Sequence, residues 1–187
     1  QKRMAALEDD QELKALESSQ WFQDSKKWSE EARYFHWKLE YPEVFYDQDG
    51  TPKDEPGFDA IIGNPPYVDF KTLPQSQKDL IEPLHSTSSG KFDLYIPFIE
   101  DAISLSRRMV SFIVPSMFMK RDYGRDLRQY LVDKTSLRTL LDFQHLQIFG
   151  DATNFTCTVI FDNQASDTAH YKKLNKNEQL TDLLEYT

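Results

Sequence analysis

The sequence predicts an α/β fold in which helices cover a mostly parallel sheet, with a helical segment in front of it at the N-terminus. Two short apolar runs, Phe58–Ile62 and Met109–Val114, are each followed directly by Gly or Pro, as is typical of buried strands that end in loops. Between them, residues 92–106 place apolar side chains at helical spacing, over a stripe wide enough to pack on a sheet. Strands that alternate with helices favour a parallel, covered sheet.

The N-terminal part of the chain predicts helices without a core of their own. Residues 1–35 are polar, contain neither Pro nor Gly, and carry apolar side chains at roughly helical intervals. We expect one or two exposed helices there. Residues 36–57 follow with short aromatic pieces and a turn-rich loop that ends at Gly57.

After the second apolar run, the sequence again alternates between helical and strand patterns. Arg125–Val132 has a weaker helical pattern, and Ser136–Phe143 and Phe155–Phe161 predict two further strands, the last of them hairpin-like. Residues 166–187 are polar again and predict no particular element.

Composition and charge limit the class of protein. With 187 residues, 39% of them hydrophobic and 28% charged, the chain is long and apolar enough for one globular core. The net charge of −9 argues against a self-sufficient nucleic-acid binder, because neutralising phosphates needs a basic surface. The chain starts at Gln1 and has neither a signal peptide nor an apolar span of about 18 residues. We therefore expect a cytoplasmic protein without a membrane segment, trimmed at its N-terminus.

The cysteine and histidine content predicts neither a disulfide nor a metal site. Cys157 is the single cysteine, and its apolar neighbours favour a buried structural thiol over a nucleophile. The four histidines are too dispersed for a zinc-type spacing.

The tetrapeptide Asn64–Tyr67 directly follows the first predicted strand, at the carboxyl end where open α/β sheets place their sites. The side-chain oxygen of Asn64 and the carbonyl oxygen of Pro65 can accept both hydrogens of an exocyclic amine such as that of adenine. Such a pair draws the nitrogen toward the tetrahedral form whose lone pair can attack.

The residues around this acceptor pair fit the same chemistry. Pro65 and Pro66 in succession fix the backbone, and Tyr67 offers a flat face to a base swung out of a duplex. Gly63 allows the backbone to approach a ligand closely. The alternative for the tetrapeptide is a rigid turn that only closes the strand.

Phe58–Val68 resembles motif IV of the gamma-class adenine-N6 DNA methyltransferases, especially those in type IIG restriction-modification enzymes and related phage-defence methylases. The resemblance continues over roughly residues 35–162 in the order of that family. Gly90–Phe98 is similar to motif V, and Ile148–Ile160 is similar to motif VIII. It implies a Rossmann-like sheet that binds S-adenosylmethionine and methylates DNA as part of a larger restriction-modification or defence enzyme.

The resemblance also assigns roles to single residues. It implies that Asn64, Pro65, Pro66 and Tyr67 form the catalytic motif, and that Phe98 lies against the adenine of S-adenosylmethionine. Gly63 is a second candidate for contact with the cofactor. The resemblance further implies that Phe149 packs on the flipped base opposite Tyr67. Double-stranded DNA would then be bound through the parent enzyme.

The sequence departs from the family in one large respect, because none of its six glycines forms the glycine-rich cofactor motif that the family carries upstream. We therefore expect a fragment: a helical segment (1–35), the catalytic half of the methyltransferase domain (36–165) and a polar C-terminal segment (166–187). In such a fragment Phe58–Ile62 is an exposed edge strand, covered by the N-terminal segment or by a second copy of the chain. Alone, it would bind no cofactor and be inactive.

Other functions remain open from the residues alone. The same acceptor pair could serve the N4 amine of cytosine or a glutamine amide, although Tyr67 and the breadth of the resemblance favour adenine. A non-catalytic DNA-binding or assembly module on the same fold is a second alternative. A nuclease is a third, suggested only by the Glu-any-Lys pattern of Glu12–Lys14 in a helical context.

Overall fold

A computed structural model describes residues 10–32, 35–144, 146, 148, 155–164 and 168–175. The chain divides into two compact units, Gln1–Phe45 and Tyr46–Thr187, and each is described by itself. No helix in the described ranges is long and apolar enough to cross a membrane.

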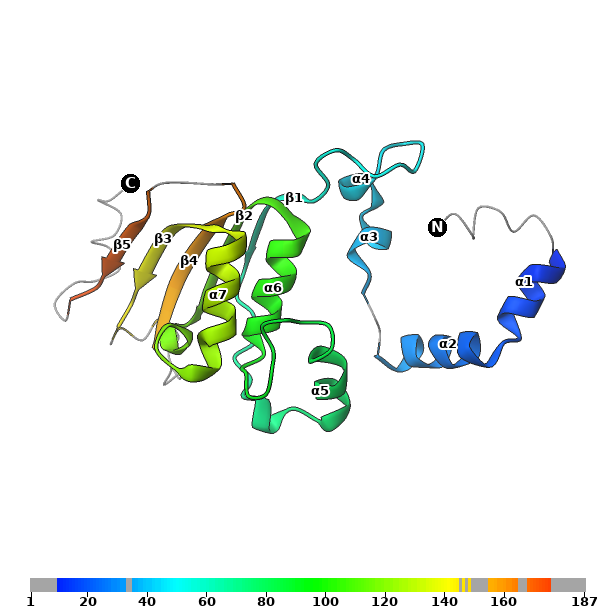
Figure 1. Cartoon of the computed structure of the whole chain (residues 1–187), viewed down its shortest axis with the longest axis horizontal. Helices are drawn as coiled ribbons and strands as arrows, with labels where there is room; N and C mark the ends of the chain where they lie inside the picture. Colours follow the sequence, from blue (N-terminus) through cyan, green and yellow to red (C-terminus); the bar gives the residue numbers. More distant parts are fainter. Residues whose placement is uncertain are drawn as a thin grey trace. The chain divides into compact units, whose positions relative to one another are not determined.

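The first unit consists of helices (Figure 1). The polar segment at the N-terminus forms α1 (Asp10–Glu17) and α2 (Gln20–Ala32), so the expected pair of helices is present. Two short helices follow, α3 (Trp37–Glu40) and α4 (Pro42–Phe45). Phe45 is buried, and the ammonium group of Lys38 lies 6.0 Å from the centre of its ring.

The second unit is built on a five-stranded sheet of order β1-β2-β4-β3-β5 (Figure 1). The strands are β1 (Phe58–Gly63), β2 (Ser106–Pro115), β3 (Ser136–Asp142), β4 (Thr156–Asp162) and β5 (His170–Lys173). β1 runs parallel to β2 and β3 runs parallel to β5, whereas β4 is antiparallel to both β2 and β3.

The sheet is therefore mixed: β1, β2, β3 and β5 run in one direction, in line with the prediction of a mostly parallel sheet, and β4 runs against them, in line with the predicted hairpin-like last strand. The reason is the connection between β3 and β4, which begins and ends at the same edge of the sheet: the Phe143 amide donates to the Thr156 carbonyl at 3.1 Å. Since β3 ends and β4 begins at that edge, β4 must run back in the opposite direction between β2 and β3.

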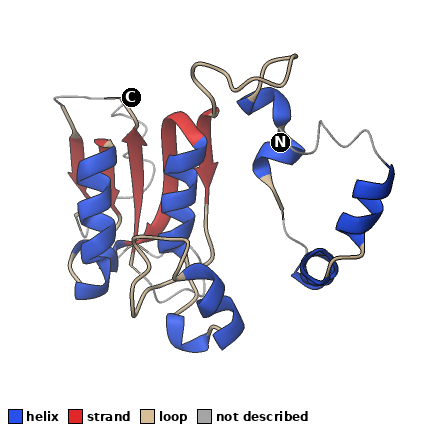
Figure 2. Ribbon diagram, turned by 45° about the vertical axis from the view of Figure 1, so that its right-hand side comes forward, coloured by secondary structure: helices blue, strands red, loops and turns tan. Residues whose placement is uncertain are grey.

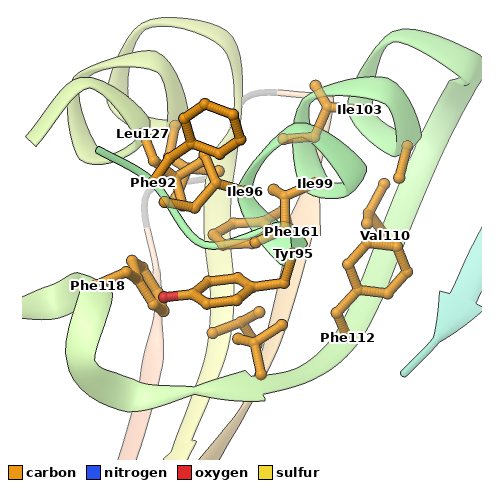
Figure 3. Close-up of a cluster of buried hydrophobic side chains, with 14 of the residues drawn as sticks. Phe92, Tyr95, Ile96, Ile99, Ile103, Val110, Phe112, Phe118, Leu127 and Phe161 are labelled. Atoms are coloured by element: carbon orange, nitrogen blue, oxygen red, sulfur yellow. The ribbon is translucent and has the colours of Figure 1, made fainter. Parts of the chain in front are cut away.

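Two helices, α6 (Tyr95–Leu105) and α7 (Arg125–Lys134), lie side by side on one face of the sheet (Figure 2). The core lies between them and the strands. Tyr95, Ile96 and Ile99 of α6 have no exposed surface and pack with side chains of β2 and β4, namely Val110, Phe112, Val114, Cys157, Val159 and Phe161 (Figure 3). Burying a side chain of this size stabilises a fold by about 1.5–3 kcal/mol, so this cluster is the main stabilising element.

Cys157 belongs to this cluster and confirms the prediction of a structural thiol. Its side chain is buried, and burial together with the nearby Asp142 carboxylate raises the pKa of the thiol to about 12. A thiol that stays protonated at neutral pH is a poor nucleophile.

The connections hold short elements: η1 (Phe70–Thr72) and α5 (Gln75–Ile81) precede α6, and η2 (Ser116–Met119) and η3 (Asp122–Gly124) precede α7. A Cβ atom at Gly124 would lie 2.2 Å from the Phe118 carbonyl oxygen. Only glycine at position 124 therefore allows η3 to pass this close to η2.

The two edges of the described sheet differ. β1 lies at one edge, as expected, and its Ile62 side chain is 83% exposed. β5 lies at the other edge, in the segment whose polar sequence predicted no element. Its side chains are mostly exposed, so it is held to β3 by backbone pairing between Thr139–Asp142 and His170–Lys173 and not by an apolar face.

Candidate active site

Polar and aromatic residues gather at the edge of the sheet where β1, β2, β3 and β5 end. The loops that leave these strands meet the start of β4 there, because β4 runs in the opposite direction. The tetrapeptide Asn64–Tyr67 leaves β1, and η2 leaves β2 beside it. This is the edge at which open α/β sheets bind ligands.

Tyr67 fixes the tetrapeptide to the neighbouring strand. Its hydroxyl donates a hydrogen bond of 3.0 Å to the carbonyl oxygen of Ile113. The last pair of the β1–β2 ladder is Gly63 with Phe112, so this carbonyl lies one residue beyond the ladder. The Tyr67 ring also meets the Tyr95 ring edge to face, with centres 6.4 Å apart. The hydroxyl thus anchors the loop to β2, and the ring rests on α6.

The environment keeps the Tyr67 phenol protonated. Burial raises the pKa of Tyr67 to about 12, and the nearby Cys157 contributes in the same direction. A neutral phenol is a hydrogen-bond donor, which is what the contact with the Ile113 carbonyl requires. The side chain is half-buried, so part of its ring remains accessible.

Asn64 lies at the very end of β1 with its side chain exposed, and its amide makes no hydrogen bond to any residue that the structure describes. Pro65 behind it is buried and Pro66 is exposed. The loop is therefore held at Pro65 and Tyr67, while the Asn64 amide stays available to a ligand. This arrangement places a solvent-exposed acceptor on a loop that is anchored through Tyr67.

Packing inside the protein explains why position 63 is a glycine. A Cβ atom at this position would lie 2.9 Å from Cε1 of Phe112, whose side chain is buried in the core. The predicted close approach of the backbone to a ligand is a separate role, and it stays a prediction.

The loop that follows the tetrapeptide is joined to the segment that resembles motif V. The Leu94 amide donates to the Val68 carbonyl at 2.9 Å, and the Phe70 amide donates to the Phe92 carbonyl at 3.1 Å. Asp93 lies between these contacts, and burial raises the pKa of its carboxyl group. The two predicted motifs are thus held together by backbone hydrogen bonds.

Phe98 is exposed on a helix whose other apolar residues are mostly buried. Its side chain is 45% exposed, whereas Tyr95 and Ile99 on the same helix are fully buried. An ordinary core position would bury the ring. The ring thus leaves a flat face accessible, and its role beside the adenine of S-adenosylmethionine stays a prediction.

The helix that carries Phe98 is held in place by the loop before it. The backbone amides and hydroxyl groups of Ser86 and Thr87 all donate to the Glu100 carboxylate, at 2.6–3.0 Å. Burial raises the pKa of Glu100, but these hydrogen bonds outweigh it, and the pKa is lowered overall.

Phe149, the predicted second half of the base clamp, lies outside the described residues, as do residues 150–154 after it. Its role therefore stays a prediction.

Four residues at the same edge were missed by the sequence analysis: Lys120, Gln144, Phe155 and Lys173, which line one groove. Lys120 and Gln144 follow the ends of strands, Phe155 directly precedes β4, and Lys173 is the last residue of β5. The position after a strand end could have drawn attention to Lys120 and Gln144. Nothing in the sequence could have added Lys173, because β5 was not predicted.

Comparison with known proteins gives a family match over most of the chain. Residues 2–149 match the model of the Eco57I restriction-modification methylase family. Over 115 residues the chain is 31% identical to the type II restriction enzyme and methyltransferase RM.Eco57I of Escherichia coli, covering 59% of this chain and 12% of that protein. The chain spans between 11% and 20% of the length of this and two other curated relatives.

Solved structures share the fold at low identity. A candidate class I S-adenosylmethionine-dependent methyltransferase from Listeria monocytogenes superposes with a TM-score of 0.52 at 11% identity, over 74% of this chain and 44% of that one. The type IIL restriction-modification enzyme MmeI, solved in complex with DNA, gives a TM-score of 0.50 at 16% identity, over 62% and 17% of the two chains. The sheet and helices described above thus have the fold of class I methyltransferases.

Proposed function

The chain belongs to the Eco57I restriction-modification methylase family, and from this premise we propose that it forms the catalytic site of a DNA methyltransferase that modifies the N6 amine of adenine. The observation that carries the proposal is the exposed Asn64 amide at the end of β1, on a loop anchored by the hydrogen bond from Tyr67 to Ile113.

Asn64 and Pro65 have one task in this mechanism, which is to hold the two hydrogens of the target amine. The Asn64 side-chain oxygen accepts one hydrogen and the Pro65 carbonyl oxygen accepts the other. The amine nitrogen then keeps its lone pair localised and pointed away from both acceptors. It would form its new bond to the methyl carbon as the bond between that carbon and the sulfonium sulfur breaks, so that the sulfur leaves as a neutral thioether, and one of the amine hydrogens leaves to solvent as a proton.

Positioning supplies much of the rate in such a scheme. S-adenosylmethionine, when bound, supplies a methyl group on a sulfonium that is already a reactive donor. The residues of this chain therefore need to align the amine and exclude misaligned poses. Pro65 and Tyr67 keep the acceptors in place before the base arrives, so little order is lost on binding.

The base and the cofactor would each meet an aromatic ring. The accessible part of the Tyr67 ring would stack on the flipped adenine, with Phe149 on its other side, and such stacking is worth about 1–3 kcal/mol per base. The exposed Phe98 ring would lie against the cofactor base, near the backbone at Gly63. Both assignments rest on the motif resemblance together with the exposure of the rings.

The proposed substrate is double-stranded DNA, bound by a larger restriction-modification or defence protein in the cytoplasm. Support comes from the family, and from the related fold of MmeI, which was solved with DNA. The net charge of −9 is compatible with this proposal, because most of the basic DNA-binding surface would lie in the rest of the larger protein, outside residues 1–187.

The product identifies the reaction. DNA lacking prior modification would be incubated with the protein that contains residues 1–187 and with S-adenosylmethionine, digested to nucleosides, and separated by mass spectrometry. We expect N6-methyladenine. N4-methylcytosine would move the proposal to the other base amine, and methylation of glutamine in a protein substrate, with unmodified DNA, would refute it.

A further inference from the structure

A groove of about 410 Å³ lies at the carboxyl edge of the sheet, on the same edge as Asn64. Its walls come from the ends of four strands. Ser116 and Lys120 follow β2, Gln144 follows β3, Phe155 precedes β4, and Lys173 and Leu174 lie at the end of β5.

Backbone hydrogen bonds join these walls to one another. The Ser116 amide donates to the Phe155 carbonyl at 2.9 Å, and the Leu174 amide donates to the Asp142 carbonyl at 3.0 Å. The Gln144 side chain is held as well, because its amide nitrogen donates to the Asp142 carboxylate at 2.5 Å. The shape of the groove is thus built by the fold itself, which lowers the cost of binding a ligand there.

The charge of the groove is opposite to that of the chain. The sequence has 31 acidic and 22 basic residues, yet among the residues that the structure describes the charged side chains that line the groove are Lys120 and Lys173, and both are exposed. Phe155 adds an aromatic surface that is 54% exposed. Lysines beside an exposed ring match what a nucleic-acid strand presents, because its phosphates are anionic and its bases have flat faces.

The groove lies close enough to Asn64 to bind the same DNA strand whose target base reaches Asn64. Neighbouring strands of a sheet are about 4.8 Å apart, so the groove extends from about 5 to about 19 Å from β1, across β2, β4, β3 and β5. A DNA strand rises by about 3.4 Å per nucleotide. The groove therefore lies within about six nucleotides of the target.

We propose that this groove holds the phosphodiester backbone of DNA beside the target base, with Lys120 and Lys173 each neutralising one phosphate. The proposal rests on the proposed function and deepens it, since it names the surface of this chain that meets the substrate. It requires only a local patch of positive charge, so it is compatible with an acidic chain.

The test uses the salt dependence of DNA binding, because each lost phosphate contact lowers the slope of log affinity against log salt by about 0.9. Binding of a short fluorescein-labelled duplex to the protein that contains residues 1–187 would be measured by anisotropy over a salt series. Lys120→Gln and Lys173→Gln should each reduce the slope by about 0.9, and the double variant by about 1.8. Lys134→Gln is the matched control: Lys134 is an exposed lysine at the end of α7, two positions before Ser136, where β3 begins at the opposite edge of the sheet.

The outcomes separate this proposal from the proposed function. If the wild-type protein methylates adenine but the double variant keeps the wild-type slope, the groove does not hold phosphates and the inference is wrong, while the catalytic assignment stands. A reduction as large in Lys134→Gln would also overturn it, because the effect would then be one of net charge. Asn64→Ala should keep the full wild-type slope even though it loses methylation.

Discussion

Removing only the hydroxyl of Tyr67 tests whether this residue anchors the catalytic loop. Tyr67→Phe keeps the ring, and so keeps its contact with Tyr95 and its stacking surface. It loses the 3.0 Å hydrogen bond to the Ile113 carbonyl. A hydrogen bond of this kind contributes about 0.5–1.5 kcal/mol net, and leaving a buried acceptor without a partner can cost up to about 3 kcal/mol. Because Tyr67 is only half-buried, we expect the lower range, about 1 kcal/mol.

The assay for Tyr67→Phe combines stability with activity. A loss of about 1 kcal/mol lowers the melting temperature of a domain of this size by roughly 2–4 °C, which circular dichroism resolves. Tyr171→Phe is the control, since Tyr171 is 62% exposed and its substitution should change nothing. A Tyr67→Phe variant as stable as the wild type would refute the anchoring role.

The raised pKa of Tyr67 adds a second readout. The ordinary tyrosine pKa is 10.0, and in the folded protein it is about 12, so between these values the folded state holds a proton that the unfolded state has released. Stability therefore falls as the pH rises from 10 toward 12. Tyr67→Phe removes this group, so its stability should fall less steeply over that interval. An identical pH dependence would show that the hydroxyl is not protected by the fold.

Two further predictions separate packing from binding. Gly63→Ala should destabilise the protein by about 1–3 kcal/mol in urea unfolding, because the new methyl group meets the buried Phe112 ring; an unchanged midpoint would mean that the ring moves aside freely. Phe98→Ala should weaken S-adenosylmethionine binding several-fold, measured by calorimetry in the protein that contains this chain, while the melting temperature stays within about 2 °C because the ring is half exposed. A large loss of stability with unchanged binding would instead assign Phe98 to the core.

The sequence was sufficient for the parts of the fold that depend on local apolar pattern. β1 and β2 were predicted because the runs at Phe58–Ile62 and Met109–Val114 are apolar and end at Gly or Pro. β2 packs against α6, and β1 adds Ile61 to the same core cluster. The placement of Asn64 at the end of β1 followed directly, since a residue after a strand must lie at its carboxyl edge.

The parts that depend on distant partners were not predictable. β5 pairs through its backbone, so its polar residues carry no strand pattern. The antiparallel direction of β4 agrees with the hairpin-like last strand that the sequence predicted, whereas the place of β4 between β2 and β3 was not predicted. The contact from Tyr67 to Ile113 joins residues 46 positions apart, and the groove with Lys120 and Lys173 needs β5 in place.

The central claim is that Asn64 accepts a hydrogen of the target amine, and a single-turnover rate tests it most directly. Methyl transfer from labelled S-adenosylmethionine to DNA would be followed in the wild-type protein, in Asn64→Ala and in Asn64→Asp, with cofactor binding measured separately. Losing one positioned hydrogen-bonding group at a reacting centre costs about 100- to 1,000-fold, so Asn64→Ala should be slower by at least about 100-fold at unchanged cofactor affinity. Asn64→Asp, which keeps an acceptor oxygen, should retain more activity than Asn64→Ala. An Asn64→Ala variant that transfers methyl groups at the wild-type rate would contradict the mechanism.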